Sequence, residues 1–185
     1  KWNHITSTIN PNDITIDANN YIVSSTNGGL LLLDTNHELE IISKNMSNLD
    51  IVDIGTDEMG LVWLTGNAPN SNIQILNASY SLITLINHLD VDSILDFCFY
   101  EDRAFAIYTS LTETGILEFN YDSNDIPFFK DFYPMNELDN ITIIHDVDIY
   151  ENFIYVSTNA GLFSANFLNS NLKNMSSWTE VIIGE

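Results

Sequence analysis

Residues 57–65 read Asp57-Glu58-Met59-Gly60-Leu61-Val62-Trp63-Leu64-Thr65, which is a polar turn followed by an apolar run. The run is rich in residues that favour β-strands, and Gly60 tolerates the positive φ that a tight hairpin requires. A second apolar run, at residues 51–54, precedes the turn, and a third follows at residues 73–76. The stretch therefore predicts consecutive antiparallel strands joined by short turns.

The same layout of strands and turns returns four times along the chain. The second strand of each repeat begins at Tyr21, Leu61, Ala104 or Phe153, so the repeats are 40, 43 and 49 residues apart. Periods of this length are typical of four-stranded β-propeller blades. Each repeat also contains a candidate fourth, outer strand, at residues 39–42, 80–86, 128–133 and 178–183.

These repeats predict an all-β fold, a β-propeller with four consecutive four-stranded antiparallel blades. The blades are expected at residues 11–47, 48–88, 89–136 and 137–185, within one propeller domain or fragment. Residues 1–10 resemble the last outer strand, with a Trp in the same place, and are expected to form the outer strand of a preceding blade. The chain is then expected to be part of a larger propeller, with a closed four-bladed ring as the alternative.

The charge of the chain limits its partners. Five basic residues against 26 acidic ones give a net charge of −21, which repels phosphate backbones and excludes direct nucleic-acid binding. Uninterrupted apolar runs such as residues 30–33 are far too short to insert into a membrane. The acidity suits a solvated surface, a basic partner, divalent cations or a saline habitat.

The repeats resemble those of the bacterial two-component regulator propeller family. The resemblance rests on the Ile51-Val52-Asp53-Ile54 strand, on residues 57–65 quoted above, and on Thr158-Asn159-Ala160-Gly161-Leu162-Phe163. The end of the chain, Asn171-Leu172-Lys173-Asn174 followed by Trp178, is similar to blades of secreted propellers associated with type IX secretion. The third repeat lacks both the Trp and the turn Gly of this pattern.

The resemblance implies a role outside the cytoplasm, in the periplasm, at the cell surface or in secretion. We expect a non-catalytic scaffold that binds a protein or glycan partner, one that is basic if the acidity is functional, or a small ligand. The first alternative is the ligand-sensing ectodomain of a two-component-type receptor. The second is a propeller hydrolase or lyase with its site in the central channel.

Titratable residues do not form a recognisable catalytic or zinc motif. Asp53, Asp96 and Asp148 fall at corresponding places in three repeats, which favours a repeated structural role such as binding backbone amides. The single Cys98 lies in an apolar strand and is expected to be buried and unreactive. The four histidines are too far apart in sequence for zinc-ligand spacing.

Loops at one end of the blades are the candidate partner-binding face, because loops often carry function on a rigid scaffold. Glycines in these loops are alternatively explained by turn geometry. The candidate residues are Asn12, Asn27, Gly28, Asp50, Asn70, Asn72, Asp92, Thr112, Glu113, Asp139 and Asn159.

Asp122, Asn124 and Asp125 are candidate calcium ligands, because they place three side-chain oxygens in one polar loop. The loop lacks the Gly and the distant Glu of an EF-hand, so an Asx-rich turn between strands is the alternative. The sequence indicates no other metal and no organic cofactor. Trp63, in the second strand of its repeat, is expected in the core.

Overall fold

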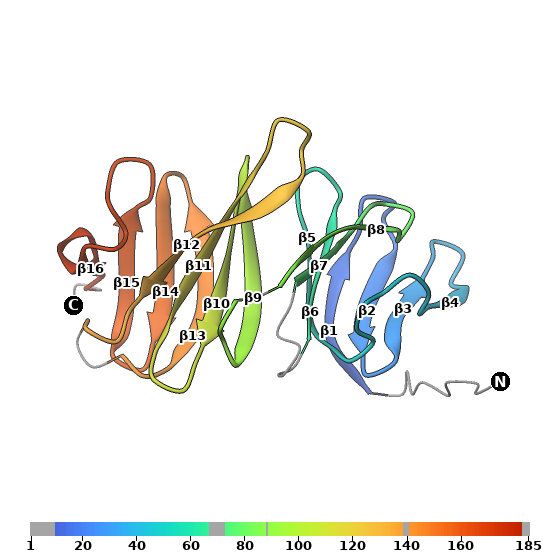
Figure 1. The fold of residues 1–185 in the computed structure, drawn as a ribbon, viewed down its shortest axis with the longest axis horizontal. Helices are drawn as coiled ribbons and strands as arrows, with labels where there is room; N and C mark the ends of the chain where they lie inside the picture. The colour runs from blue at the N-terminus through green and yellow to red at the C-terminus, as the bar shows by residue number, and fades with distance from the viewer. Residues whose placement is uncertain (1–9, 67–72, 88, 139–140, 183–185) are drawn as a thin grey trace. The chain divides into compact units, whose positions relative to one another are not determined.

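The computed structural model describes residues 10–66, 73–87, 89–138 and 141–182, and in these residues the chain is built from β-strands (Figure 1). It forms two compact units, Lys1–Leu95 and Asp96–Glu185, and each is described by itself. The strands form four four-stranded sheets, each in sequential antiparallel order. The predicted fold class is confirmed in that every repeat forms one blade-like sheet.

The N-terminal unit contains two of these sheets, with strand orders β1-β2-β3-β4 and β5-β6-β7-β8. The first sheet consists of β1 (Pro11–Ile16), β2 (Ile22–Thr26), β3 (Gly29–Leu33) and β4 (Leu39–Ile42). The second consists of β5 (Ile51–Thr56), β6 (Val62–Gly66), β7 (Ile73–Leu76) and β8 (Leu82–Ile86).

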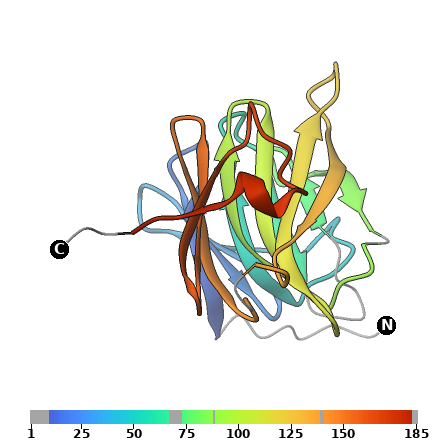
Figure 2. The same ribbon diagram turned by 90° about the vertical axis from the view of Figure 1, so that its left-hand side faces the viewer.

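The C-terminal unit contains the other two sheets, which lie as two layers (Figure 2). The third sheet consists of β9 (Ser93–Tyr100), β10 (Arg103–Thr109), β11 (Thr114–Tyr121) and β12 (Pro127–Pro134). The fourth consists of β13 (Ile144–Tyr150), β14 (Phe153–Thr158), β15 (Gly161–Asn166) and β16 (Thr179–Glu180), with the 3-10 helix η1 (Met175–Ser177) before its last strand.

Each unit has an apolar core between its two sheets. In the N-terminal unit, Val23, Leu30 and Leu32 of the first sheet share a buried cluster with Val62 and Leu64 of the second. Alternate residues of a strand point to opposite faces, so this cluster uses one face of each sheet. The corresponding cluster of the C-terminal unit includes Phe105, Ile107, Ile116, Val147, Ile154, Val156 and Phe163.

Five hairpin loops share one local design, an Asx turn closed by a residue with positive φ. In the loop before β6, the Asp57 Oδ1 accepts the backbone N–H groups of Met59 at 3.0 Å and Leu61 at 2.8 Å, and Gly60 has a φ of 78°. The side chain thus replaces backbone partners that the turn leaves unpaired. Equivalent pairs of turn acceptor and positive-φ residue are Asp17 with Asn20, Asp34 with His37, Asn77 with Tyr80, and Asp122 with Asp125.

The same Asp57 explains why the repeat pattern pairs an Asp with a Trp. Its second oxygen, Oδ2, accepts the indole Nε1–H of Trp63 at 2.8 Å. Trp63 is completely buried, as the sequence predicts for a core residue. One carboxylate therefore closes the hairpin and satisfies the polar atom of the largest buried side chain in the next strand.

Within each unit, an Asp side chain in the first strand of one sheet accepts a backbone N–H from the first strand of the other sheet. The Asp13 Oδ2 accepts the Ile54 N–H at 3.1 Å, and the Asp96 Oδ2 accepts the Val147 N–H at 3.0 Å. Asp96 therefore has the structural, amide-binding role expected from repetition, and the structure gives the same role to Asp13, which sequence reasoning had not singled out.

The proposed equivalence of Asp148 with Asp53 is wrong. Both sheets carry a bulge at the same place, Ile51/Asp53 and Ile144/Asp146, after which Asp53 pairs with Thr65 and Asp146 pairs with Ser157. Asp146 therefore holds the position assigned to Asp148.

The last predicted strand, at residues 178–183, is much shorter in the structure. Within the described residues, the strand β16 is limited to Thr179–Glu180, and the Val181 N–H adds one further hydrogen bond to the Leu162 carbonyl of β15 at 2.8 Å. Trp178 is instead buried beside η1, where its Nε1–H donates to the Leu172 carbonyl at 3.0 Å. Within the described residues, no helix is long and apolar enough to cross a membrane.

Candidate functional site

Two predicted face residues, Asn12 and Asn27, meet at one end of the first sheet. The Asn12 Nδ2 donates to the Asn27 Oδ1 at 2.9 Å and to the Ile51 carbonyl at 2.6 Å. The Gly29 N–H donates to the Leu49 carbonyl at 2.8 Å, which ties the β2–β3 turn to the strand entry of the second sheet. Both asparagines are exposed, yet each is held in place by specific partners.

The β2–β3 and β14–β15 turns are near copies of each other. The Thr26 hydroxyl accepts the Gly28 N–H at 3.0 Å and donates to the Gly29 carbonyl at 2.8 Å. In the other turn, the Thr158 hydroxyl accepts from Ala160 and donates to Gly161 at 3.0 and 2.9 Å. The Gly28 amide is therefore engaged within its own turn, which supports the structural explanation for this residue.

Asn159 holds the turn position in the fourth sheet that Asn27 holds in the first. Its Oδ1 accepts the N–H groups of Thr142 at 3.0 Å and Ile143 at 2.9 Å. Asn159 is exposed, and its Nδ2 has no hydrogen-bond partner within the described part of the chain. Because its Oδ1 is fixed by two backbone amides, the Nδ2 group of Asn159 is held in a defined direction.

The β10–β11 turn carries two further predicted residues. Glu113 is half-buried and its Oε1 accepts the Tyr108 hydroxyl at 2.8 Å. Thr112 is exposed, and its N–H lies 3.4 Å from the Ser110 hydroxyl oxygen. Of this pair, Thr112 is the residue whose side chain is available to a partner.

The remaining predicted face residues differ in burial and in their hydrogen bonds, and three of them lie outside the described residues. Asp50 is half-buried just before β5, and its N–H donates to the Asn48 Oδ1 at 3.0 Å. Asp92 is exposed just before β9. Asn70, Asn72 and Asp139 lie outside the described residues.

The candidate calcium loop forms the Asx turn that was its alternative. The Asp122 Oδ1 accepts the Asn124 N–H at 2.8 Å and the Ile126 N–H at 3.0 Å, and these bonds lower the pKa of its carboxyl. Asp125 supplies the positive φ of the turn, 59°. Across residues 10–66, 73–87, 89–138 and 141–182, no three His, Cys, Asp or Glu side chains gather as a metal site.

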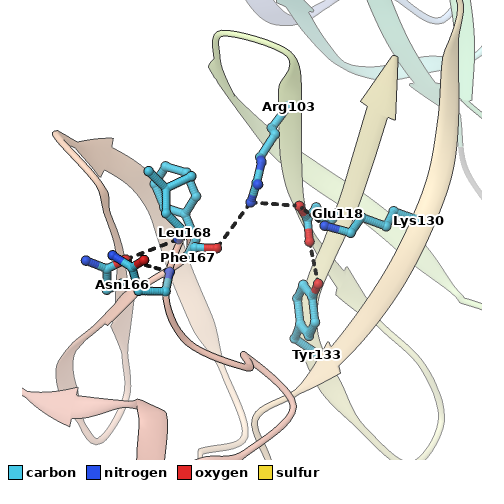
Figure 3. A network of polar contacts seen from close by, with 8 residues as sticks. Arg103, Glu118, Lys130, Tyr133, Asn166, Phe167 and Leu168 are labelled. Carbon is cyan, nitrogen blue, oxygen red and sulfur yellow. Dashed lines mark hydrogen bonds and ion pairs between the residues drawn. The ribbon is translucent and has the colours of Figure 1, made fainter. Parts of the chain in front are cut away.

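A charged network that sequence reasoning missed lies in the third sheet (Figure 3). Glu118 of β11 is only 1% exposed, and its Oε1 lies 2.8 Å from the Lys130 Nζ and 3.4 Å from the Arg103 Nη1. Its Oε2 accepts the Tyr133 hydroxyl. Two cations and a phenol thus compensate a carboxylate that burial alone would strongly disfavour.

Arg103 extends this network to the fourth sheet. Its Nη1 also donates to the Phe167 carbonyl at 3.1 Å, and its guanidinium lies 5.4 Å from the centre of the Phe167 ring. The signal in the sequence was Glu118 itself, a lone charge within the otherwise apolar run 115–119. The network holds the two sheets of the C-terminal unit together.

Two buried groups, the Tyr133 phenol and the Cys98 thiol, are held in their neutral forms. Burial, followed by the hydrogen bond to Glu118, raises the pKa of Tyr133 above its ordinary value. Burial also raises the pKa of the Cys98 thiol, and the neighbouring carboxylates Asp148, Asp96 and Asp146 raise it further. At neutral pH these groups donate hydrogen bonds or pack, and they do not supply a base or a thiolate.

No protein-family model matches the chain, and no curated protein matches it. Solved structures do match. PorZ, a surface component of the type-IX secretion system of Porphyromonas gingivalis, shares 16% identity with a TM-score of 0.63 over 94% of this chain. The extracellular domain of the putative hybrid two-component system BT3049 from B. thetaiotaomicron shares 16% identity, with a TM-score of 0.56 over 84% of this chain.

An enzyme is also among the similar structures. Virginiamycin B lyase from Staphylococcus aureus shares 14% identity, with a TM-score of 0.56 over 83% of this chain. The chain spans 26% of PorZ, 21% of the BT3049 structure and 50% of the lyase. At these identities the likeness concerns the fold, and it agrees with the propeller resemblance of the repeats. The chain has a β-propeller fold.

Proposed function

We propose that this chain is a non-catalytic, extracytoplasmic β-propeller module that binds a protein or glycan partner through loops at the ends of its blades. The observation that carries the proposal is the pair of turn asparagines. Asn27 and Asn159 occupy the same turn position, both are exposed, and both have Oδ1 fixed by a specific hydrogen bond. Each therefore presents an Nδ2 donor whose orientation is set before any partner arrives, which lowers the entropy cost of binding.

The acidity of the chain supports a basic partner. A net charge of −21 accelerates the approach of a cationic surface, and salt weakens that attraction. A location outside the cytoplasm is supported by the similarity to a surface component and to a receptor's extracellular domain.

The test is binding of the chain to arrays of glycans and of basic peptides, followed by titration of each hit. We expect Asn27→Ala and Asn159→Ala each to weaken binding about tenfold, as loss of one well-oriented hydrogen bond does. Asn36→Ala is the matched control, because Asn36 lies in the β3–β4 turn, at the opposite end of the first sheet from Asn27. Binding that survives both face substitutions but is lost in the control would overturn the proposal.

A ligand-sensing ectodomain is the second candidate function, favoured by the similarity to the extracellular domain of BT3049. In this candidate function, the same blade-end loops bind a small ligand. Thermal stabilisation by small molecules, without any hit on the peptide and glycan arrays, would favour this candidate.

A further inference from the structure

Tyr80 adopts a backbone conformation that is rare for a large side chain. It lies in the β7–β8 turn with a φ of 57°, in the left-handed region that bulky residues seldom enter. The corresponding positions of four other turns hold residues that tolerate this region, Asn20, His37, Gly60 and Asp125. A strained residue persists only where its surroundings over-determine it. The contacts of the Tyr80 side chain therefore indicate why a Tyr is held in this turn.

The Tyr80 side chain reaches from the second sheet to the first. Its hydroxyl donates to the Asp17 Oδ2 at 2.5 Å, across 63 residues of sequence. Tyr80 is 9% exposed and Asp17 is 5% exposed, so the bond is sheltered from water. Tyr80 also belongs to the buried apolar cluster that contains Val23 of β2. One side chain of the second sheet thus joins the core of the first sheet and satisfies one of its buried carboxylates.

This bond has a counterpart within the second sheet. Asp17 holds the place in its hairpin that Asp57 holds in the next one, since each Oδ1 accepts two backbone N–H groups of its own turn. The Asp57 Oδ2 accepts the indole of Trp63 from the same hairpin. Strand pairing places Val23 where the second sheet has Trp63. Because Val has no polar donor, the first hairpin cannot supply the indole bond, and the Tyr80 hydroxyl takes its place.

Two further contacts hold the β1–β2 turn against turns of the second sheet. The Asn19 Nδ2 donates to the Ala78 carbonyl, close to Tyr80, at 3.2 Å. A Cβ added at Gly60, in the β5–β6 turn, would lie 2.7 Å from the Ala18 Cβ, so these two turns are in close contact. The Tyr80 bond is therefore part of a wider contact between neighbouring turns.

We propose that Tyr80 is a clasp between the first two sheets, and that it replaces, from the neighbouring sheet, the Trp that the repeat pattern places within the hairpin. Trp63 satisfies its Asp locally and stabilises one hairpin. Tyr80 satisfies Asp17 across sheets, so the closed state of the β1–β2 hairpin depends on the second sheet. Release of the clasp opens the β1–β2 hairpin, while the β5–β6 hairpin stays closed through Trp63.

The test is hydrogen exchange in the full chain, read at the Asn19 and Tyr21 amides, which donate to the Asp17 carboxylate. Tyr80→Phe removes the hydroxyl and keeps the ring. We expect both amides to exchange at least about tenfold faster in this variant, because loss of a hydrogen bond to a carboxylate favours opening of the turn by that factor or more. Unchanged exchange at both amides would overturn the proposal.

Tyr108→Phe is the matched control. The Tyr108 hydroxyl also donates to a carboxylate, that of Glu113 at 2.8 Å, but the two residues belong to one hairpin of the C-terminal unit. The control should leave exchange in the first sheet unchanged. In the Tyr80→Phe variant, the Leu61 amide, which donates to Asp57, should also be unchanged. Faster exchange there by the same factor would mean loss of stability throughout the unit, and it would count against a clasp.

A rescue experiment tests the replacement of Trp by Tyr80. Val23→Trp alone should lower the melting temperature, because the Tyr80 ring fills the space and overpacking destabilises a core. Tyr80→Gly removes the ring and suits the positive φ of the turn. In that background Val23→Trp should instead raise the melting temperature by about 4 °C or more, since it supplies a buried ring and an indole donor to Asp17. An effect of the same sign in both backgrounds would refute the replacement.

Discussion

The buried carboxylate of Glu118 makes a sharp prediction for stability. Glu118→Gln keeps the shape of the side chain but removes the charge that compensates Arg103 and Lys130. Breaking a buried ion pair from one side costs roughly 3–5 kcal/mol. The two cations are 21% and 38% exposed and recover part of their hydration, so we expect a loss of about 3 kcal/mol. For a unit of this size that lowers the melting temperature by about 10 °C or more.

The assay is urea unfolding followed by circular dichroism, with hydrogen exchange in β10–β12 to assign the transition to the C-terminal unit. Lys173→Met is the matched control, because the Lys173–Asp131 pair is also close, at 2.7 Å, but its side chains are 54% and 34% exposed. An exposed pair of this kind contributes less than about 1 kcal/mol.

A double-mutant cycle between Glu118→Gln and Arg103→Met then isolates the coupling, which we expect to be about 1–2 kcal/mol. The reasoning is refuted if Glu118→Gln changes the free energy of unfolding by no more than the Lys173 control does. Such a result would mean that the two cations are adequately solvated without the carboxylate.

Three further predictions concern other buried groups. Trp63→Ala should cost roughly 3–5 kcal/mol, as removal of a large buried side chain does; an unchanged melting curve would show that Trp63 is not in the core. Cys98 should react with thiol reagents slowly in the folded chain and rapidly in urea, because burial raises the pKa of its thiol; equal rates would contradict its burial. Burial also raises the pKa of Tyr80 and Tyr133 in the folded state above the ordinary value of 10.0. Their contribution to stability is therefore complete below about pH 10 and is lost as the pH rises above it. Tyrosinate absorbance and urea unfolding check this, and titration of both phenols near pH 10 in a folded chain would contradict it.

Local features of the fold could be predicted because their partners are close in sequence. Asp57 and Trp63 belong to one hairpin, separated by six residues, so the spacing of acceptor, turn and strand is visible in the repeat itself. The same holds for the Asx turn at Asp122, which the sequence already offered as an alternative to a calcium loop. Strand positions follow from short apolar runs bounded by such turns.

Register was beyond sequence reasoning where hairpins differ in length. Both sheets carry the same bulge, but Thr56 pairs with Val62 whereas Ile149 pairs with Ile154, so the β13–β14 hairpin is one residue shorter than the β5–β6 hairpin. Asp146 and Asp148 each precede a β-branched residue, as Asp53 does, and alignment of repeats by residue type selected Asp148, two positions too late. Trp178 was misplaced for a different reason: it lies before the last strand, and its indole donates to the Leu172 carbonyl beside η1.

The sequence by itself determined the repeat, the hairpin turns and the buried Trp63, because these depend on interactions within a few residues. Only the tertiary structure decided the surroundings of Glu118, whose partner Lys130 lies 12 residues away and Tyr133 15, and the 64-residue link from Arg103 to Phe167. It also decided that Tyr80 of the second sheet binds Asp17 of the first, 63 residues away. Both outcomes depend on how sheets stack, and stacking is set by the sum of many distant contacts that no local pattern encodes.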